Sequence, residues 1–258
     1  VRVRKIQQAQ PEGYAASADP AGRDRVGDGH LGATLPRTSA PKMTDLDPMT
    51  DSDVDPAMAR PVRSKDCSLD RLTVELEAEL EGVAPIDVDG AQVASLLRAY
   101  AASEDSWRRY AIFGESSYGR NLIWRSRDFE LLLLCWRSGQ ASAIHDHGDQ
   151  NCWMAILDGA LEEEHFSARD GQLKRGRVKV YEAGGLAFIR DEIALHQIRA
   201  GEAGDGVSLH LYARPIDDCL SFCPESGEST PIRVGYTSVR GTPCGDADPD
   251  AIRTAWTG

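Results

Sequence analysis

Two histidines stand two residues apart in this chain, at His145 and His147. Side chains alternate between the two faces of an extended segment, so both imidazoles point to the same side of a strand. One metal ion can then bind both rings, because neutral imidazole is a common metal ligand. Glycines frame the pair at Gly139 and Gly159. The spacing therefore predicts a metal site on a β-strand between two turns.

The run from Gly139 to Gly159 resembles the first metal motif of the cupin barrels, with one departure. Most cupins have a glutamate ligand where this chain has Cys152. Without that carboxylate a divalent ion keeps its full charge and open coordination positions, which favours a thiolate substrate and suits iron that activates dioxygen. A third neutral ligand is then needed. His196 and His210 are the candidates, and His196 better fits the single histidine of the second cupin motif.

Three polar residues, Ser208, His210 and Tyr212, alternate with two leucines in one predicted strand and so share one of its faces. Inside a barrel such groups must bond to one another or to a ligand. We therefore expect a relay of hydroxyl, imidazole and phenol. The alternative is that this polar face meets solvent while the leucines form the core.

Arg120 follows Tyr118 and Gly119 at the start of the first predicted strand. A guanidinium inside a barrel needs a carboxylate, which it can bind through two parallel hydrogen bonds. The sequence places no acidic residue obviously in that role, so a substrate carboxylate becomes a candidate. A surface arginine is the alternative.

The composition narrows the class of protein. A net charge of −12 argues against a nucleic-acid surface. No apolar run approaches the roughly 18 residues of a membrane span. The six cysteines form no CxxC pair, which argues against a zinc ribbon and favours reduced thiols. We expect a cytoplasmic monomer that binds neither nucleic acid nor membrane.

The chain divides into three predicted parts: a disordered tail over 1–65, one domain over 66–248 and a C-terminal tail over 249–258. The tail is rich in proline, alanine and aspartate and almost free of aromatics. Helices are predicted over 69–80 and 91–101, with a short third one capped by Ser103. Short strands follow over 121–124, 129–136, 152–157, 160–166, 177–181, 186–189, 196–198, 207–212 and 232–236. This pattern predicts a mainly β fold, a small jelly-roll barrel with an N-terminal helical cap.

Several motifs together resemble the cysteine dioxygenases of type I, a cupin family of thiol dioxygenases. The motifs are Tyr118–Leu122, Leu134–Trp136, Ser142–His147, Cys152, Leu195–His196, Val207–Tyr212 and Asp218–Cys219. The resemblance implies ferrous iron on His145, His147 and His196, with the carboxylate of L-cysteine on Arg120. Both atoms of O₂ would go to sulfur, giving cysteine sulfinic acid, a step of cysteine catabolism and taurine biosynthesis.

The resemblance also implies roles around the iron. Cys152 and Tyr212 match a pair joined by a thioether bond in the animal-type enzymes, and His210 joins them among the catalytic residues. The matching substrate-binding residues are Arg120, Tyr118, Trp136 and Tyr212, and the matching outer residues are Ser208 and Cys219. Phe188 and Arg190 depart from the family, which typically has tyrosine and asparagine there.

Two other functions remain open. One is a dioxygenase of another small thiol, such as mercaptopropionate or cysteamine; the arginine at 120 favours cysteine, because mercaptopropionate dioxygenases have a glutamine there. The other is a non-catalytic cupin that binds a metal. Such proteins usually keep the glutamate ligand that this chain lacks.

Overall fold

The computed structural model describes residues 68–103, 105–169, 172–245 and 247–256, so the predicted tail over 1–65 lies outside it. Its helices are α1 (Leu69–Leu80), η1 (Pro85–Asp87), α2 (Gly90–Ser103), η2 (Ser106–Tyr110) and α3 (Pro249–Trp256). Its strands are β1 (Gly119–Arg125), β2 (Phe129–Trp136), β3 (Ile144–His145), β4 (Asn151–Asp158), β5 (Ala160–Arg169), β6 (Gln172–Glu182), β7 (Leu186–Ile189), β8 (Leu195–Ala200), β9 (Gly206–Ala213), β10 (Asp218–Phe222), β11 (Ser229–Arg233), β12 (Ser238–Val239) and β13 (Thr242–Pro243).

The N-terminal helices begin and end at local signals in the sequence. The hydroxyl of Ser68 accepts a hydrogen bond from the backbone N–H of Arg71, which caps α1. The carboxylate of Asp89 does the same for α2. The predicted third helix is instead the 3₁₀ turn η2, which starts after Asp105 without a side-chain cap, so its prediction at Ser103 was wrong.

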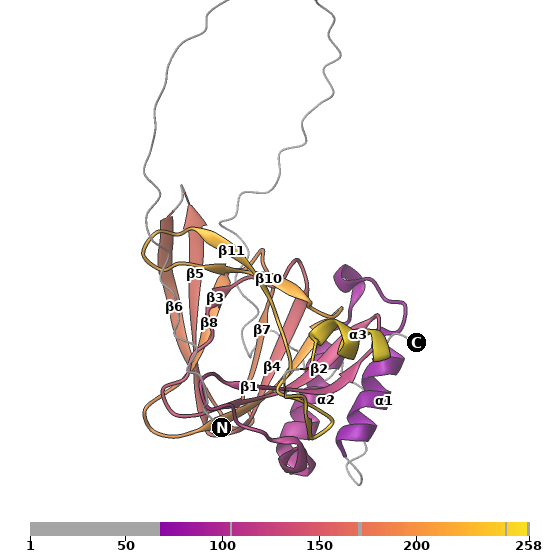
Figure 1. Ribbon diagram of the computed structural model, residues 1–258. Coiled ribbons are helices and arrows are strands. Elements are labelled where there is room, and N and C mark those ends of the chain that lie inside the picture. The colour runs from indigo at the N-terminus through magenta and orange to yellow at the C-terminus, as the bar shows by residue number, and fades with distance from the viewer. Residues whose placement is uncertain (1–67, 104, 170–171, 246, 257–258) are drawn as a thin grey trace, which may run out of the picture. The chain divides into compact units, whose positions relative to one another are not determined.

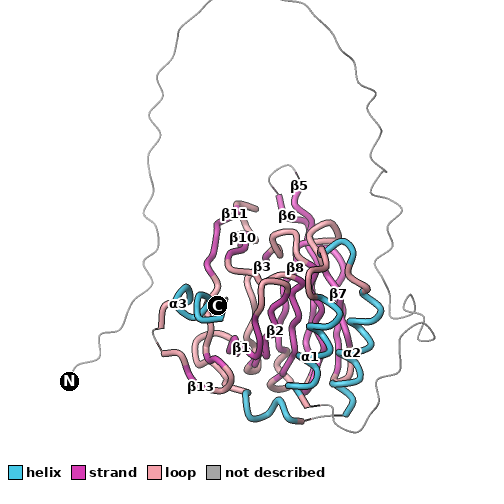
Figure 2. Tube along the Cα trace, turned by 90° about the vertical axis from the view of Figure 1, so that its right-hand side faces the viewer, coloured by secondary structure: helices cyan, strands magenta, loops and turns pink. Residues whose placement is uncertain are grey.

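The strands form two sheets. Sheet A has the order β13-β12-β1-β2-β9-β4-β7, and sheet B has the order β11-β10-β3-β8-β5-β6. The helices α1 and α2 lie side by side against sheet A (Figures 1 and 2). This arrangement confirms the predicted mainly β fold with an N-terminal helical cap.

The central strands of sheet A are buried on both faces. In β2, Leu131, Leu133 and Cys135 pack against the helices. The alternating residues, such as Leu132 and Leu134, pack into a second core that includes side chains of sheet B. Burial on both faces explains why β2 is almost continuously apolar. The second core surrounds the residues singled out above for chemistry.

Gly159, one of the two glycines that frame the histidines, has a structural role. It joins β4 to β5 at a φ of 70°, and a Cβ atom there would lie 2.3 Å from the backbone oxygen of Asp205. Both features require glycine. The position of Gly159 in the metal motif therefore reflects a tight turn that sets where the next strand begins.

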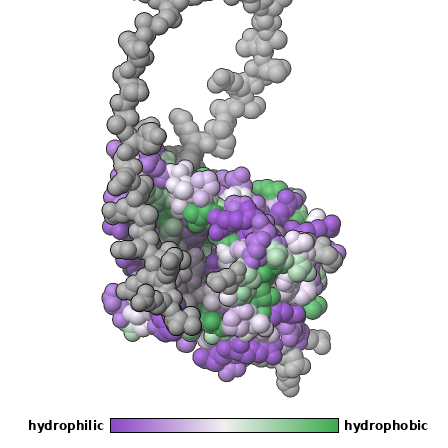
Figure 3. All heavy atoms as spheres, viewed as in Figure 1, coloured by the Kyte–Doolittle hydropathy of each residue, from purple (hydrophilic) through white to green (hydrophobic). Residues whose placement is uncertain are grey.

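The C-terminal part of the chain differs from the prediction in two places. The strand expected over 232–236 is β11, Ser229–Arg233, so residues 234–236 lie beyond its end. Helix α3 occupies most of the segment predicted as a C-terminal tail, and its Arg253 is buried. Among the described residues, no helix is long and apolar enough to cross a membrane. The face viewed in Figure 3 mixes hydrophilic and hydrophobic residues.

Candidate metal centre

Three histidines from two strands and a loop converge in the second core. His145 and His196 lie opposite each other in the β3–β8 ladder, and His147 follows β3. Their ligand atoms all lie within 4.8 Å of one another. Among the residues that the structure describes, this is the one group of three or more histidine, cysteine or carboxylate side chains that could hold a metal ion. The structure thus brings together all three predicted ligands.

The surroundings of the three rings leave one nitrogen of each ring for a metal. The Nδ1 atom of His145 lies 2.9 Å from the backbone oxygen of Ala143, and that of His196 lies 2.8 Å from Glu163 Oε1. Each Nδ1 can donate its proton to that oxygen, which leaves Nε2 as the acceptor. The donor set therefore contains Nε2 of His145, Nε2 of His196 and a ring nitrogen of His147.

The chemistry of these rings fits a divalent metal. Burial lowers the pKa of His145 well below its usual value, with His196 and His147 adding to the effect. Burial also lowers the pKa of His196 to about 4, although Glu163 opposes this. Both rings are thus neutral at pH 7, the state that binds metals. Neither ring nitrogen of the buried His147 has a hydrogen-bond partner among the described residues. A metal ion bound to the ring would satisfy one of these two nitrogens.

A small cavity of about 40 Å³ lies beside the histidines. Its walls also include Arg120, together with Tyr118 stacked on Trp136 at 4.2 Å between ring centroids. The guanidinium Nη2 of Arg120 is buried and has no hydrogen-bond partner within the described ranges. Burial by itself lowers the pKa of Arg120, but Tyr212, Tyr118 and Glu130 raise it above its usual value. One cavity is therefore lined by both a candidate metal-binding group and a buried cation.

Cys152 and Tyr212 are partners in the β4–β9 ladder, and Cys152 is buried. Burial, together with Glu163, raises the pKa of the Cys152 thiol, and contact with Tyr212 opposes the change. Burial also raises the pKa of Tyr212. The pair lies beside the histidines, since the ring centroids of His147 and Tyr212 are 6.2 Å apart.

The predicted relay is seen only in part. The indole N–H of Trp136 donates to Ser208 Oγ at 3.0 Å, and Ser208 Oγ lies 2.9 Å from Nε2 of His210. His210 and Tyr212 share no hydrogen bond among the described residues, and their ring centroids are 6.2 Å apart. The link from imidazole to phenol is absent, because the Nδ1 atom of His210 faces Cys152 Sγ at 4.0 Å instead. Cys219 also lines the cavity.

Comparison with known proteins decides the family. The sequence model of the cysteine dioxygenase type I family matches residues 58–224. The chain belongs to the cysteine dioxygenase type I family. Among curated relatives, the cysteine dioxygenase type 1 of Rattus norvegicus is 32% identical over 160 residues, which cover 60% of this chain and 80% of that protein. That of Danio rerio is 31% identical over 156 residues, 58% of this chain and 78% of that protein.

Solved structures give a weaker likeness. A conserved protein with a double-stranded β-helix domain from Klebsiella pneumoniae has a TM-score of 0.37 and 14% identity, covering 51% of this chain and 90% of that one. A score this low carries no argument. Membership in the cysteine dioxygenase type I family therefore depends on the sequence match, and the three-histidine group is compatible with iron.

Two acidic residues that contact the histidines in this cysteine dioxygenase family member were not predicted from the sequence. Glu163 is buried beside His196, and it also accepts a hydrogen bond from Tyr181. His165 also lies 3.3 Å from the Glu163 carboxylate, with 14% of its side chain exposed. Alternation with the buried Leu161 could have placed Glu163 on the inner face of its strand.

The second missed residue, Asp191, holds the loop that carries His147. Its carboxylate accepts hydrogen bonds from the backbone N–H groups of His147 and Asp149, both at 2.7 Å. Burial would raise the pKa of Asp191, but its contacts with His147 and these N–H groups keep that pKa below the usual value. Asp149 sits at a φ of 63°, so this carboxylate stabilises a tight loop.

Proposed function

We propose that this protein is an iron(II)-dependent cysteine dioxygenase, which oxidises L-cysteine with O₂ to cysteine sulfinic acid. Membership in the cysteine dioxygenase type I family supports an enzyme of this kind. The observation that carries the proposal is the lining of one cavity. Three imidazoles converge there, and the same cavity is lined by Arg120, whose buried guanidinium has a nitrogen without a hydrogen-bond partner among the described residues.

The ligand set supports a thiolate substrate. His145, His147 and His196 are uncharged ligands, so a divalent ion on them keeps its whole charge and attracts an anion. Ferrous iron held there would supply the chemistry that adds both oxygen atoms of O₂ to sulfur. The protein contributes position and charge.

The size and charge of the cavity support cysteine. About 40 Å³ is room for about three or four water molecules, which suits a small amino acid better than a peptide. Arg120 would bind the carboxylate of L-cysteine through the nitrogen that lacks a partner. The stacked rings of Tyr118 and Trp136 form the adjoining wall.

We also propose that Cys152 and Tyr212 become joined by a thioether bond. Their opposition in the β4–β9 ladder supports this. The bond would form between Sγ and a ring carbon, with loss of the thiol hydrogen and one ring hydrogen, and O₂ would take up the two electrons and two protons. The link would fix the phenol of Tyr212 beside the substrate. His210, held by Ser208, would keep Cys152 in place, and Cys219 would complete the wall.

Oxygen uptake tests the proposal. Iron-loaded protein is supplied with cysteine, cysteamine or mercaptopropionate, and O₂ consumption and sulfinate are measured. We expect cysteine to be turned over fastest. Preference for one of the other thiols would assign another substrate, and absence of uptake with every thiol would favour a non-catalytic metal-binding protein. That the enzyme works as a cytoplasmic monomer, without nucleic acid or membrane, stays a prediction.

A further inference from the structure

The guanidinium of Arg120 depends on a segment far along the chain. The Nε atom of Arg120 donates to the backbone oxygen of Gly235 at 3.1 Å. The backbone of Arg120 exchanges two further hydrogen bonds with Thr237, one to its hydroxyl at 2.9 Å and one from its N–H at 2.6 Å. The segment 235–237 therefore sets the position of the guanidinium that lines the cavity.

A buried polar cluster holds this segment from outside the cavity. The hydroxyl of Tyr236 donates to Glu130 Oε1 at 2.5 Å and accepts from Arg125 Nη1 at 3.1 Å. Arg125 also donates to Glu130 at 2.9 Å and to Asp217 at 2.8 Å. The side chains of Arg125 and Glu130 are 6% and 0% exposed, so these contacts are shielded from solvent.

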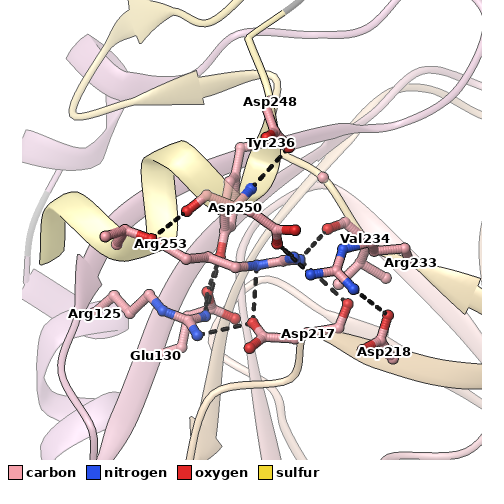
Figure 4. Close-up of polar contacts among 12 residues, drawn as sticks. Arg125, Glu130, Asp217, Asp218, Arg233, Val234, Tyr236, Asp248, Asp250 and Arg253 are labelled. Atoms are coloured by element: carbon pink, nitrogen blue, oxygen red, sulfur yellow. Dashed lines mark hydrogen bonds and ion pairs between the residues drawn. The ribbon is translucent and has the colours of Figure 1, made fainter. Parts of the chain in front are cut away.

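Arg253, on helix α3, completes the cluster. Its Nη2 atom donates to the backbone oxygens of Val234 and of Asp217, the latter at 3.2 Å. Its Nε atom lies 2.8 Å from the Asp217 carboxylate, and its Nη1 atom donates to Asp250 at 2.9 Å. Figure 4 shows this guanidinium between Val234, Asp217 and Asp250. One buried side chain thus reinforces the end of the β10–β11 ladder, where the N–H of Val234 also donates to the backbone oxygen of Asp217 at 3.0 Å.

These two segments form one wall of the cavity. Ile216 and Cys219, which flank Asp217 in the chain, line it, and Ile232 and Val234 line it just before the residues that hold Arg120. Helix α3 begins at Pro249 and so lies beyond residue 224, the last residue that the family's sequence model matches.

We propose that Arg253 is a positioning residue for substrate specificity, which fixes Arg120 for the substrate carboxylate by clamping Asp217 and Val234 together. This inference rests on the proposed function, since it concerns the carboxylate end of that site. It assigns to helix α3 the selection of thiols that carry a carboxylate. Loss of Arg253 loosens the 234–237 segment at the end of the β10–β11 ladder and lets Arg120 shift, whereas the histidines, on β3, β8 and the loop after β3, keep their places.

Binding without turnover tests this inference. Iron-loaded protein free of O₂ is titrated with L-cysteine and with cysteamine, which has the thiol and amine but no carboxylate. We expect Arg253→Met to weaken cysteine binding by about tenfold, in line with a misplaced charge-assisted contact. Cysteamine binding should change by less than about twofold. The matched control is Arg127→Met, which removes an arginine that is 77% exposed and should change neither.

Two further variants keep the outcome decisive. Arg120→Met, titrated in parallel, reports whether the carboxylate is bound there at all. If Arg120→Met weakens cysteine binding and Arg253→Met does not, or if Arg253→Met weakens both thiols equally, the inference is overturned while the proposed function stands. If Arg120→Met has no effect, the proposed function fails at this point and the inference fails with it. If Arg253→Met does not fold, Asp250→Asn takes its place, because it removes the charge of one partner of Arg253. This variant should weaken the binding of cysteine selectively, by about threefold. An equal effect on cysteine and cysteamine would overturn the inference.

Discussion

Glu163 Oε1 lies 2.8 Å from Nδ1 of His196, and both side chains are buried. Burial alone would raise the pKa of Glu163, but hydrogen bonds from His165 and His196 hold it well below its usual value. The carboxylate is therefore ionised and fixes the ring with Nε2 toward the other histidines. Such an outer carboxylate orients a metal-binding histidine and raises its basicity.

The first prediction concerns this carboxylate. Glu163→Gln keeps the shape of the side chain but removes its charge, so His196 loses a strong acceptor. We expect the iron affinity to fall by about tenfold or more. Equilibrium competition with a chelator measures the change. Glu162→Gln is the matched control, because the neighbouring side chain points to the opposite face of β5. An equal loss in both variants would contradict a role specific to Glu163.

The second prediction concerns Arg120. Arg120→Gln removes the charge that would bind the substrate carboxylate, so we expect kcat/KM for cysteine to fall by about 10- to 100-fold. Turnover of cysteamine should change much less, because that thiol has no carboxylate. Arg120→Lys keeps the charge but not the planar fork and should recover part of the loss. Equal losses for cysteine and cysteamine would show that the substitution damages the site generally.

The third prediction concerns the thioether bond. After turnover with cysteine, intact protein should lose about two hydrogens in mass and migrate slightly faster on a denaturing gel. Cys152→Ser should abolish both changes, because serine cannot form the bond. Cys135→Ser serves as the control, since that buried cysteine faces the helices on the other side of sheet A. A free Cys152 thiol throughout turnover would remove the crosslink from the proposal.

The sequence was most informative where the chemistry is local. His145 and His147 lie on one segment, so their spacing alone places two rings together. Glu163 reaches His196 across 33 residues through pairing of β5 with β8, and a run of charged residues hides which one points inward. Arg253 likewise meets Asp217 across 36 residues. Contacts of this kind depend on strand order, which no local pattern specifies.

The relay shows another limit of local reasoning. Alternation correctly put Ser208, His210 and Tyr212 on one buried face of β9. It could not tell which neighbour each ring faces, because that depends on the adjoining strands. Cys152, on β4, lies near His210 Nδ1, and Trp136, on β2, donates to Ser208. The polar groups are therefore paired mainly across the sheet rather than along the strand.

The last prediction concerns pH and the metal-free protein. Burial lowers the pKa of His196 to about 4 and the pKa values of His145 and His210 well below their usual value. Between pH 6.5 and about 4 all three rings stay neutral in the folded state but gain protons when the chain unfolds. The unfolded state then binds more protons, so the free energy of unfolding must fall as the pH falls through this window. Three such groups give a slope of up to about 4 kcal/mol per pH unit.

Urea unfolding of metal-free protein at several pH values measures this slope. His210→Gln removes one of the three titrating rings and should reduce the slope by roughly a third. The variant keeps a side chain that can accept from Ser208, which limits other damage to the core. Free energies of unfolding that stay level from pH 7 to pH 5 would show that these rings take up protons in the folded protein as readily as in the unfolded chain. Protons would then compete with a metal for the rings below pH 6.5, which would count against the proposed iron site.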